Sequence, residues 1–246
     1  MAHAVLTRDP ASAAAYAAAL APLGLDVVAM PVTRHAPAAD PRALDRALDA
    51  QYAAIVVASP RAAHELARAA AGRALPEVWA VGPATLRALA IAKIAARHPD
   101  GARDGAELAR RLVASRPLRG QRVLVPRAEE GRVEALELLR AAGADVVDVV
   151  AYRTLPVPPG DPALARGAEL LAAGRAAVCA VFAPSQVAAL AAVTGPLGEL
   201  ATAFCAIGET TAAAVRAAGV ARVAVAPEPT PAGIARAVRS VYSPRT

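Results

Sequence analysis

The chain has 246 residues, of which 56% are hydrophobic and only 3% aromatic, and its formal net charge is +6. This length is too great for one small core, so we expect two domains with cores of alanine, valine and leucine. The positive charge favours anionic partners such as a polycarboxylate ligand, nucleic acid or an acidic membrane. Neither a secretory leader nor the ~20 apolar residues of a membrane span can be read in the sequence, so we expect a cytoplasmic protein that crosses no membrane.

The first predicted element is a short buried strand, AVLT at 4–7, with Arg8 at its carboxyl end. Asp9 and Pro10 fit the start of an alanine-rich helix, which a glycine ends. A second strand follows in LDVVAMP at 25–31. Strand, helix and strand in this order form a βαβ unit, whose right-handed crossover requires parallel strands.

The same unit recurs at a shift of 119 positions, which carries Arg8 onto Arg127 and Gly24 onto Gly143. Two further phrases of strand, small polar residues and helix also occur twice. They are AAIVVASPRAA at 53–63 with AVCAVFAPSQVAAL at 177–190, and WAVGPATLRAL at 79–89 with CAIGETTAAAV at 205–215. The chain therefore contains two similar α/β halves.

Two arrangements suit this order: tandem domains joined once near SRPLRGQ (115–121), or interleaved domains. In the interleaved arrangement, residues 1–33 and 155–246 form one domain and 38–150 the other, with linkers at 34–37 and 151–154. Proline and polar residues gather in TRHAPAADP and AYRTLPVPPGD, directly after the second strand of each unit, which favours interleaving. The predicted fold class is α/β, with two similar doubly wound parallel-sheet domains, a two-stranded linker, and the N-terminal segment completing the C-terminal domain.

Polar phrases follow the predicted strands at their carboxyl ends, where parallel sheets bind ligands and helix N-termini present free N–H groups. The candidate binding residues there are Ser59, Arg61, Gly82, Thr85, Ser185, Gly208, Thr210 and Thr211, with the strand-ending Arg8 and Arg127. Any one of them could be only a helix cap or a solvated arginine. Four such turns at equivalent strand ends favour a cleft in which arginines hold carboxylate or phosphate.

Other chemistry has no signal in the sequence, which contains no GxGxxG, P-loop, CxxC, HExxH or GxSxG motif. The histidines are scattered without ligand spacing, so we predict no metal site and no cofactor. Cys179 and Cys205 lie in apolar runs and are expected to be inert core residues. Basic residues are dispersed and aromatic residues are few, so nucleic-acid binding is not expected.

Taken in order, these phrases resemble the uroporphyrinogen-III synthase family over essentially the whole chain. The carriers are VLTR (5–8), VVASPRA (56–62), AVGPAT (80–85), GADVVDVVAYRT (143–154), VFAPSQV (181–187) and AIGETTAAAV (206–215). The resemblance implies a cofactor-free reaction in a cleft between two α/β domains. Hydroxymethylbilane, a linear tetrapyrrole, loses its terminal hydroxyl as water, passes through a spirocyclic intermediate and closes with ring D inverted. The carboxylates of that substrate would account for the positive charge and the many helix N-termini.

The resemblance also assigns roles to single residues. Tyr152 matches the tyrosine proposed in the family to assist departure of the hydroxyl, and the alternative is a strand tyrosine that caps the linker. The hydroxyl positions of the two glycine-threonine turns are Thr85, Thr210 and Thr211, and the strand-end binding phrases contribute Ser59, Arg61 and Ser185. The family's Thr-Ser pair is Ala58-Ser59 in one copy and Phe182-Ala183 in the other, so the second copy lacks an expected hydroxyl.

The activity implied by the resemblance is that of a cyclising lyase of haem biosynthesis. The alternative is a non-catalytic two-domain module that closes on an anion or a tetrapyrrole. The expected partner is the linear tetrapyrrole substrate, with neither nucleic acid nor membrane. We expect a monomer, and a transient contact with hydroxymethylbilane synthase is left open.

Overall fold

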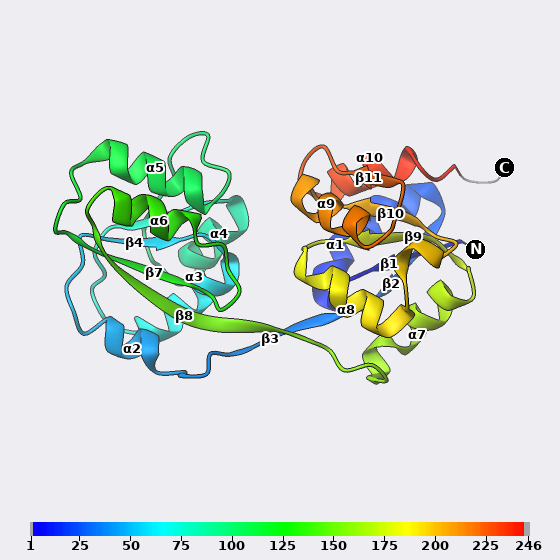
Figure 1. Cartoon of the computed structure of the whole chain (residues 1–246), viewed down its shortest axis with the longest axis horizontal. Helices are drawn as coiled ribbons and strands as arrows, with labels where there is room; N and C mark the ends of the chain where they lie inside the picture. The colour runs from blue at the N-terminus through cyan, green and yellow to red at the C-terminus, as the bar shows by residue number, and fades with distance from the viewer. Residues whose placement is uncertain (1, 244–246) are drawn as a thin grey trace. The chain divides into compact units, whose positions relative to one another are not determined.

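The computed structural model describes residues 2–243, and these divide into two compact units. Unit 1 combines the residues up to Arg34 with those from Leu155 onward, and unit 2 is His35–Thr154. The N-terminal segment thus completes the unit that the C-terminal half builds, and β3 (Thr33–Pro37) and β8 (Asp145–Pro156) mark the two passages of the chain between units in Figure 1. The predicted α/β fold class is confirmed.

Unit 1 is built on a five-stranded sheet in the order β11-β10-β9-β1-β2, and all four pairings are parallel. Its strands are β1 (Ala2–Leu6), β2 (Leu25–Ala29), β9 (Ala176–Val181), β10 (Ala203–Ala206) and β11 (Val223–Val225). Its helices are α1 (Pro10–Leu20), α7 (Pro162–Ala172), α8 (Ser185–Thr194), α9 (Glu209–Ala217) and α10 (Pro231–Arg239), with short 3-10 turns at Ala21–Leu23 and Leu197–Glu199.

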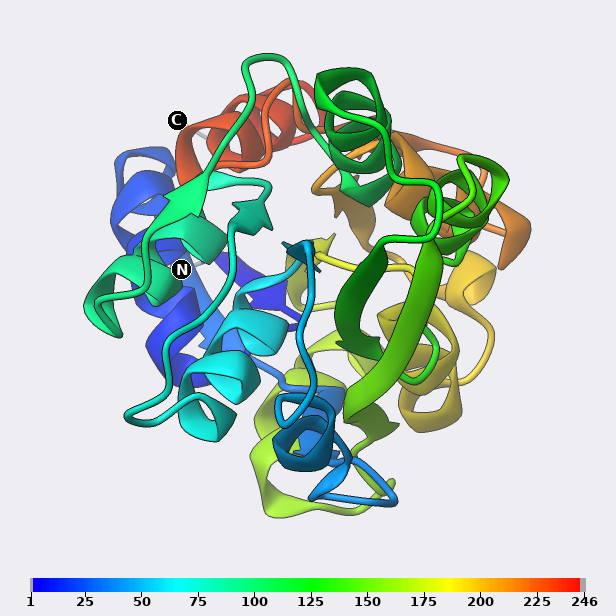
Figure 2. The same cartoon turned by 90° about the vertical axis from the view of Figure 1, so that its left-hand side faces the viewer.

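Unit 2 is built on a six-stranded sheet in the order β3-β8-β7-β4-β5-β6. Its remaining strands are β4 (Ala54–Val57), β5 (Val78–Ala80), β6 (Ala96–Arg97) and β7 (Arg122–Ala128). Its helices are α2 (Ala43–Ala47), α3 (Pro60–Ala69), α4 (Pro83–Ile91), α5 (Gly105–Ser115) and α6 (Glu134–Ala141). Figure 2 shows these helices divided between the two faces of the sheet, α3 and α4 on one and α5 and α6 on the other.

The side chains of the central strands of unit 2 point alternately to the two faces of the sheet, so this unit has two cores. Ile55 and Val57 pack with Leu124 under α3 and α4, whereas Val56 packs with Val123 under α5 and α6. Successive side chains of a strand point to opposite faces, so a continuous apolar run such as AIVV is buried on both. The short, continuous apolar runs of the sequence are therefore central strands of a doubly wound sheet, as predicted.

Unit 1 follows the same plan. Val5 packs with Cys179 and Phe204 against α7, α8 and α9, and Leu6 packs with Cys205 against α1 and α10. Both cysteines are free and buried, as expected for core residues. Their neighbours are apolar side chains, which stabilise the neutral thiol over the thiolate.

The predicted linkers at 34–37 and 151–154 are strands. β3 and β8 are hydrogen-bonded neighbours, and β8 continues for 12 residues, well beyond its pairing with β7. Arg153 Nε donates to the Pro37 carbonyl at 3.0 Å, and the Val157 N–H donates to the Val32 carbonyl at 2.9 Å. One bond comes from a side chain and the other lies just outside both strands. The partner numbers rise on one segment as they fall on the other, so the two segments run antiparallel.

The buried thiols predict a pH dependence of stability. Burial raises the pKa of Cys205 to about 12 and also raises the pKa of Cys179, the latter with a smaller contribution from Cys205. Above pH ~9 the unfolded chain loses these protons while the folded chain keeps them, so the free energy of unfolding should fall by up to ~1.4 kcal/mol per pH unit for each thiol. Urea unfolding of the wild type and of Cys179→Ala/Cys205→Ala checks this, and equal slopes against pH would contradict it.

Candidate active site

The strand order defines where a ligand is expected in each unit. In unit 2 the chain passes from β4 outward to β5 and β6, then returns to add β7 and β8 on the other side. In unit 1 it passes from β1 to β2, then adds β9, β10 and β11 on the opposite side. Open parallel sheets bind ligands at the carboxyl ends of the strands where the order reverses. Those positions are between β4 and β7 in unit 2 and between β1 and β9 in unit 1.

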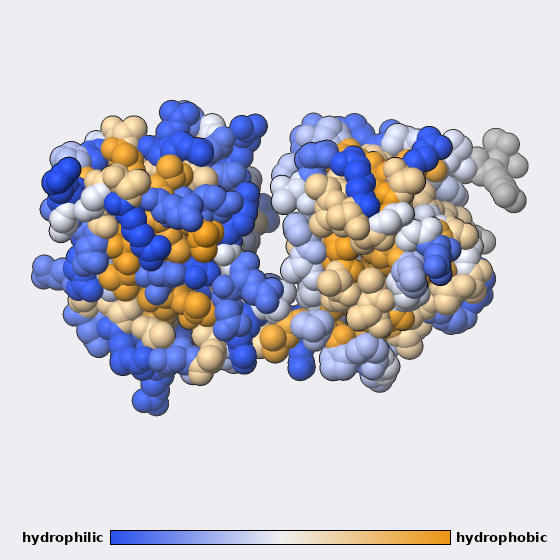
Figure 3. All heavy atoms as spheres, in the orientation of Figure 1, coloured by the Kyte–Doolittle hydropathy of each residue, from blue (hydrophilic) through white to orange (hydrophobic). Residues whose placement is uncertain are grey.

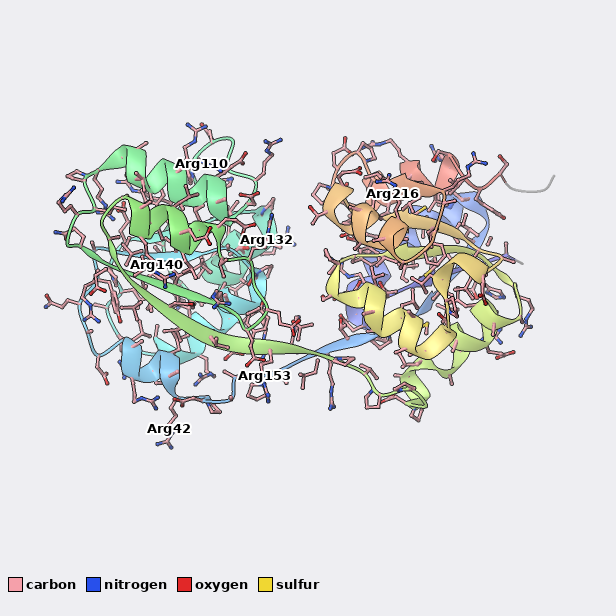
Figure 4. The ribbon with its side chains drawn as sticks, viewed as in Figure 1. Arg42, Arg110, Arg132, Arg140, Arg153 and Arg216 are labelled. Atoms are coloured by element: carbon pink, nitrogen blue, oxygen red, sulfur yellow. The ribbon has the colours of Figure 1, made fainter. Side chains whose placement is uncertain are left out.

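A pocket of 230 Å³ lies at the reversal point of unit 2. The ends of β4 and β7 form its floor, the first residues of α5 and α6 form its sides, and Tyr152 on β8 reaches it. Its polar lining is Ser59, Arg103, Asp104, Arg127, Arg132, Glu134 and Tyr152. Arg132, labelled in Figure 4 in the turn between β7 and α6, is exposed and lies 3.8 Å from Asp104.

Ser59 and Tyr152 meet in this pocket. The Ser59 Oγ accepts a hydrogen bond from the Ala62 N–H at 3.1 Å and so caps α3, and it also lies 3.1 Å from the Tyr152 hydroxyl. Tyr152 is only 7% exposed, and its ring makes an edge contact with His35, with centroids 5.3 Å apart. The phenol is therefore held at a fixed place, from which it can donate a proton to a group in the pocket.

Arg127 lines the same pocket, but its donors are used within the chain. Its Nε and Nη2 bind the two Asp148 carboxylate oxygens at 2.7 and 2.8 Å. Its Nη1 donates to the carbonyls of Ala128 and Glu129 at 2.8 and 2.9 Å. Of the five guanidinium N–H groups, one is left for a ligand. The bidentate contact that we expected Arg127 to make with a ligand carboxylate is made with Asp148 of the chain itself.

Arg61 and the Gly82 turn lie at neighbouring strand ends of unit 2. Arg61 forms an ion pair with Glu65 at 2.6 Å, one helical turn further along α3. Gly82 has φ 86, a conformation that favours glycine, and α4 begins after it without a side-chain cap. A Cβ added at Gly82 would meet nothing within 4 Å, so the space above this helix start is open.

The equivalent turns of unit 1 are also open. Ser185 is exposed at the start of α8, and Gly208 precedes α9 with no side-chain cap and no atom within 4 Å of an added Cβ. Gly208 has φ −177, extended backbone that any residue adopts, so the glycine matters here for space and not for φ. Thr210 is exposed, whereas Thr85 and Thr211 are 2% and 4% exposed. A ligand at the start of α4 or α9 would therefore meet backbone N–H groups in preference to the buried hydroxyls of Thr85 and Thr211.

Arg8 lies at the reversal point of unit 1, at the end of β1. Its Nη1 donates to the Tyr16 hydroxyl at 2.9 Å, and its guanidinium lies over the Tyr16 and Phe182 rings. The structure therefore brings Ser59, Arg127 and Tyr152 together in one pocket, and places Arg8, Ser185 and Gly208 at adjacent strand ends of unit 1.

Several side chains around these sites were missed in the sequence. They are Asp148, which binds Arg127, Gln186, which binds Thr7, the pocket residues Asp104 and Arg132, and the rings of Tyr16 and Phe182. The repeat offered one signal for these residues, namely that the two halves differ at their positions. At the shift of 119, Asp148 corresponds to Ala29, and Tyr16 corresponds to Ala135.

Charge elsewhere is dispersed. Figure 4 shows Arg42, Arg110, Arg140 and Arg153 on separate elements of unit 2, and in Figure 3 the visible face of unit 2 is bluer, hence more hydrophilic, than that of unit 1.

In the part of the chain described, no group of His, Cys, Asp and Glu side chains could hold a metal ion. Within residues 2–243, no helix combines the length and apolar character needed to cross a bilayer.

The Arg127–Asp148 pair predicts a stability effect. Both side chains are largely buried, at 18% and 24% exposed, so Asp148→Ala leaves an unpaired guanidinium and should lower the free energy of unfolding by about 1–3 kcal/mol. Asp49 forms a more exposed pair with Arg73, and Asp49→Ala should cost less than ~1 kcal/mol. Denaturant unfolding measures both, and an equal loss for the two variants would contradict the assignment.

The comparisons with known proteins agree with this fold. Residues 14–236 match the family model described as uroporphyrinogen-III synthase HemD. A mutant uroporphyrinogen III synthase from the extremely thermophilic bacterium Thermus thermophilus is 21% identical, covers 98% of each chain and has a TM-score of 0.64. Uroporphyrinogen-III synthetase from Helicobacter pylori 26695 is 15% identical, covers 98% of this chain and 100% of its own, and has a TM-score of 0.64. No curated protein matches the chain significantly.

At such identities the solved structures show a common fold, and the family model supplies the assignment. The matched residues include nearly all the repeated strand-end phrases of both halves, and they favour the synthase over a non-catalytic binding module. The chain belongs to the uroporphyrinogen-III synthase family, the cyclising lyases of porphyrin biosynthesis.

Proposed function

We propose that this chain closes hydroxymethylbilane to uroporphyrinogen III with Tyr152 as the proton donor. The observation that carries the proposal is the Ser59–Tyr152 contact of 3.1 Å, inside a pocket at the reversal point of the unit 2 sheet. A buried phenol whose hydroxyl is held by a serine is oriented before the substrate arrives. Ser59 caps α3 at the same time, so the backbone fixes the position of its oxygen.

The proposed step moves one proton. The Tyr152 phenol donates it to the terminal hydroxyl of the substrate, the carbon–oxygen bond breaks, and water leaves. The electron-poor methylene that remains is attacked by the substituted α-carbon of ring D, which yields the spirocyclic intermediate. The bond from that carbon to the ring C methylene then breaks, and the freed methylene bonds to the other α-carbon of ring D, which inverts the ring. The proton lost from that carbon returns to the Tyr152 phenolate. Loss of water and formation of a carbon–carbon bond are together redox-neutral, which agrees with our expectation that no cofactor takes part.

Binding of the carboxylated substrate is assigned to open helix starts. Asp9, Ser59, Asp104, Asp161 and Thr230 cap their helices with side-chain oxygens. The helices α4 and α9 follow β5 and β10 without such caps, so their first N–H groups remain available to carboxylates. The helix α8 also lacks a side-chain cap, but its Gln186 and Val187 N–H groups donate to the Ala183 and Pro184 carbonyls. We propose that Gly82, Ser185, Gly208 and Thr210 contribute contacts of this kind, and that Arg61 contributes the N–H donors that its ion pair with Glu65 leaves free.

A coupled assay tests the activity. The purified protein is incubated with porphobilinogen and hydroxymethylbilane synthase, and the products are oxidised and resolved by isomer. We expect isomer III, whereas isomer I alone, the product of spontaneous closure, would reject the proposal. Sedimentation of the same preparation checks the further expectation of a monomer.

Tyr152→Phe removes the proposed proton donor. We expect turnover to fall by less than about tenfold, below the 10²–10⁴-fold typical of general acids, because ring closure is intrinsically easy. Tyr52→Phe is the matched control, since the Tyr52 hydroxyl binds the Ala47 carbonyl at 2.7 Å and Tyr52 is not among the residues that line the Ser59–Tyr152 pocket. Initial rates at saturating substrate measure both, and an unchanged rate for Tyr152→Phe removes this residue from the mechanism.

A further inference from the structure

The two units use equivalent arginines differently. Arg8 follows β1, and Arg127 lies one residue before the end of β7. The ladders beside them have the same register, with Leu6 opposite Ala29 and Val125 opposite Asp148. The carboxylate that binds Arg127 is thus replaced by an alanine methyl in unit 1. Accordingly, Arg8 forms no ion pair with any residue that the structure describes.

Two aromatic rings hold Arg8 instead. Its guanidinium carbon lies 4.7 Å from the Phe182 ring centroid and 5.1 Å from that of Tyr16, within the range of a cation–π contact. The two rings meet edge to face, with centroids 4.8 Å apart. A ring fixes the plane of the cation without using its N–H groups. Among the described residues, the one hydrogen-bond partner of the guanidinium is the Tyr16 hydroxyl, which accepts from Nη1. The positive charge is held in place while most of its donors remain free.

This pair of rings, which we call the aromatic clamp, is specific to unit 1. The positions equivalent to Phe182 and Tyr16 in unit 2 are Ala58 and Ala135, and both alanines line the Ser59–Tyr152 pocket. Unit 2 therefore has an arginine paired with a carboxylate beside an open pocket. In unit 1, Arg8 packs against two rings, has no described carboxylate within ion-pair distance, and has a longer-range charge interaction with the adjacent Asp9.

Gln186 fixes the backbone on both sides of the clamp. Its Oε1 accepts hydrogen bonds from the Phe182 N–H at 2.9 Å and from the Thr7 hydroxyl at 2.6 Å. Its Nε2 donates to the Thr7 carbonyl at 2.8 Å. Thr7 immediately precedes Arg8, so one amide side chain sets the spacing between the end of β1 and the end of β9.

We propose that Arg8 is the carboxylate receptor of unit 1, and that Phe182 and Tyr16 are positioning residues that aim its guanidinium. The identity of the bound group, a carboxylate side chain of the linear tetrapyrrole, rests on the proposed function. The receptor lies where the strand order of unit 1 reverses, between β1 and β9. In this chain the arginine contact takes the place of the hydroxyl that is missing at Phe182-Ala183.

A direct binding experiment tests the receptor without turnover. Propionate, the simplest mimic of a substrate side chain, is titrated into protein labelled with ¹⁵N-arginine, and the Arg8 Nε–H signal is identified by its loss in Arg8→Lys. We expect this signal to move with propionate in the wild type and in Phe182→Tyr, which keeps a ring, and to move much less in Phe182→Leu. Arg127 is the internal control, and its signal should not move because Asp148 already occupies it.

Kinetics with hydroxymethylbilane provide the second test. Arg8→Lys keeps the charge but loses the planar fork, so KM should rise about tenfold while kcat changes little, as expected for uniform binding. Phe182→Leu should raise KM by a smaller factor, and Phe182→Tyr should restore it. An Arg8 signal insensitive to propionate, or an unchanged KM in Arg8→Lys, overturns the inference even if the wild type produces isomer III. If the Arg8 signal of the wild type moves with propionate but the coupled assay yields only isomer I, the carboxylate receptor is supported and the proposed function is rejected.

Discussion

The ladder between β1 and β9 is the constraint on which the architecture depends. It pairs Ala4 with Val178 and Leu6 with Ala180, so residues more than 170 positions apart become neighbours in the middle of a sheet. The Thr7–Gln186 hydrogen bonds lock its carboxyl end. Without this ladder, β9 and β1 would each have an unpaired edge, and the apolar residues of β1 would lose their packing against the helices that follow β8.

The same ladder creates the reversal point of unit 1, as the pairing of β4 with β7 does in unit 2. Each sheet then presents strand ends on which turns can vary without disturbing the cores beneath them. In unit 2 the ends of β4 and β7 enclose the Ser59–Tyr152 pocket, and in unit 1 the ends of β1 and β9 enclose a charged side chain. One duplicated plan thus carries a pocket in unit 2 and a ring-packed arginine in unit 1.

Much of the fold could be predicted from the sequence, because its signals are local. AIVV and VLVP are short apolar runs bounded by turns, Asp9 and Pro10 mark a helix start, and the shift of 119 shows that the pattern occurs twice. The interleaving was inferred from proline-rich stretches, although the first residues of both stretches, 33–37 and 151–156, belong to paired strands in the structure. Loop-forming residues signal a change of direction but do not show whether the segment finds a partner in a distant part of the chain.

The candidate site was less predictable, because its contacts join distant segments. Nothing near Arg127 in the sequence shows that Asp148 takes its donors, and nothing near Arg8 shows that Phe182 covers it. Likewise, Thr85 and Thr211 were interpreted as ligand-binding hydroxyls, yet the third position of each helix turns toward the core. Residue types at strand ends locate a site, while three-dimensional contacts decide which of them remain free for a ligand.

The distance in sequence between β1 and β9 has a consequence for biosynthesis. β1 leaves the ribosome first, and at typical elongation rates its partner follows about ten seconds or more later. In that interval unit 2, which is continuous in sequence, can fold by itself. Until β9 emerges, β1 and β2 lack their strand partner, and their apolar side chains stay exposed.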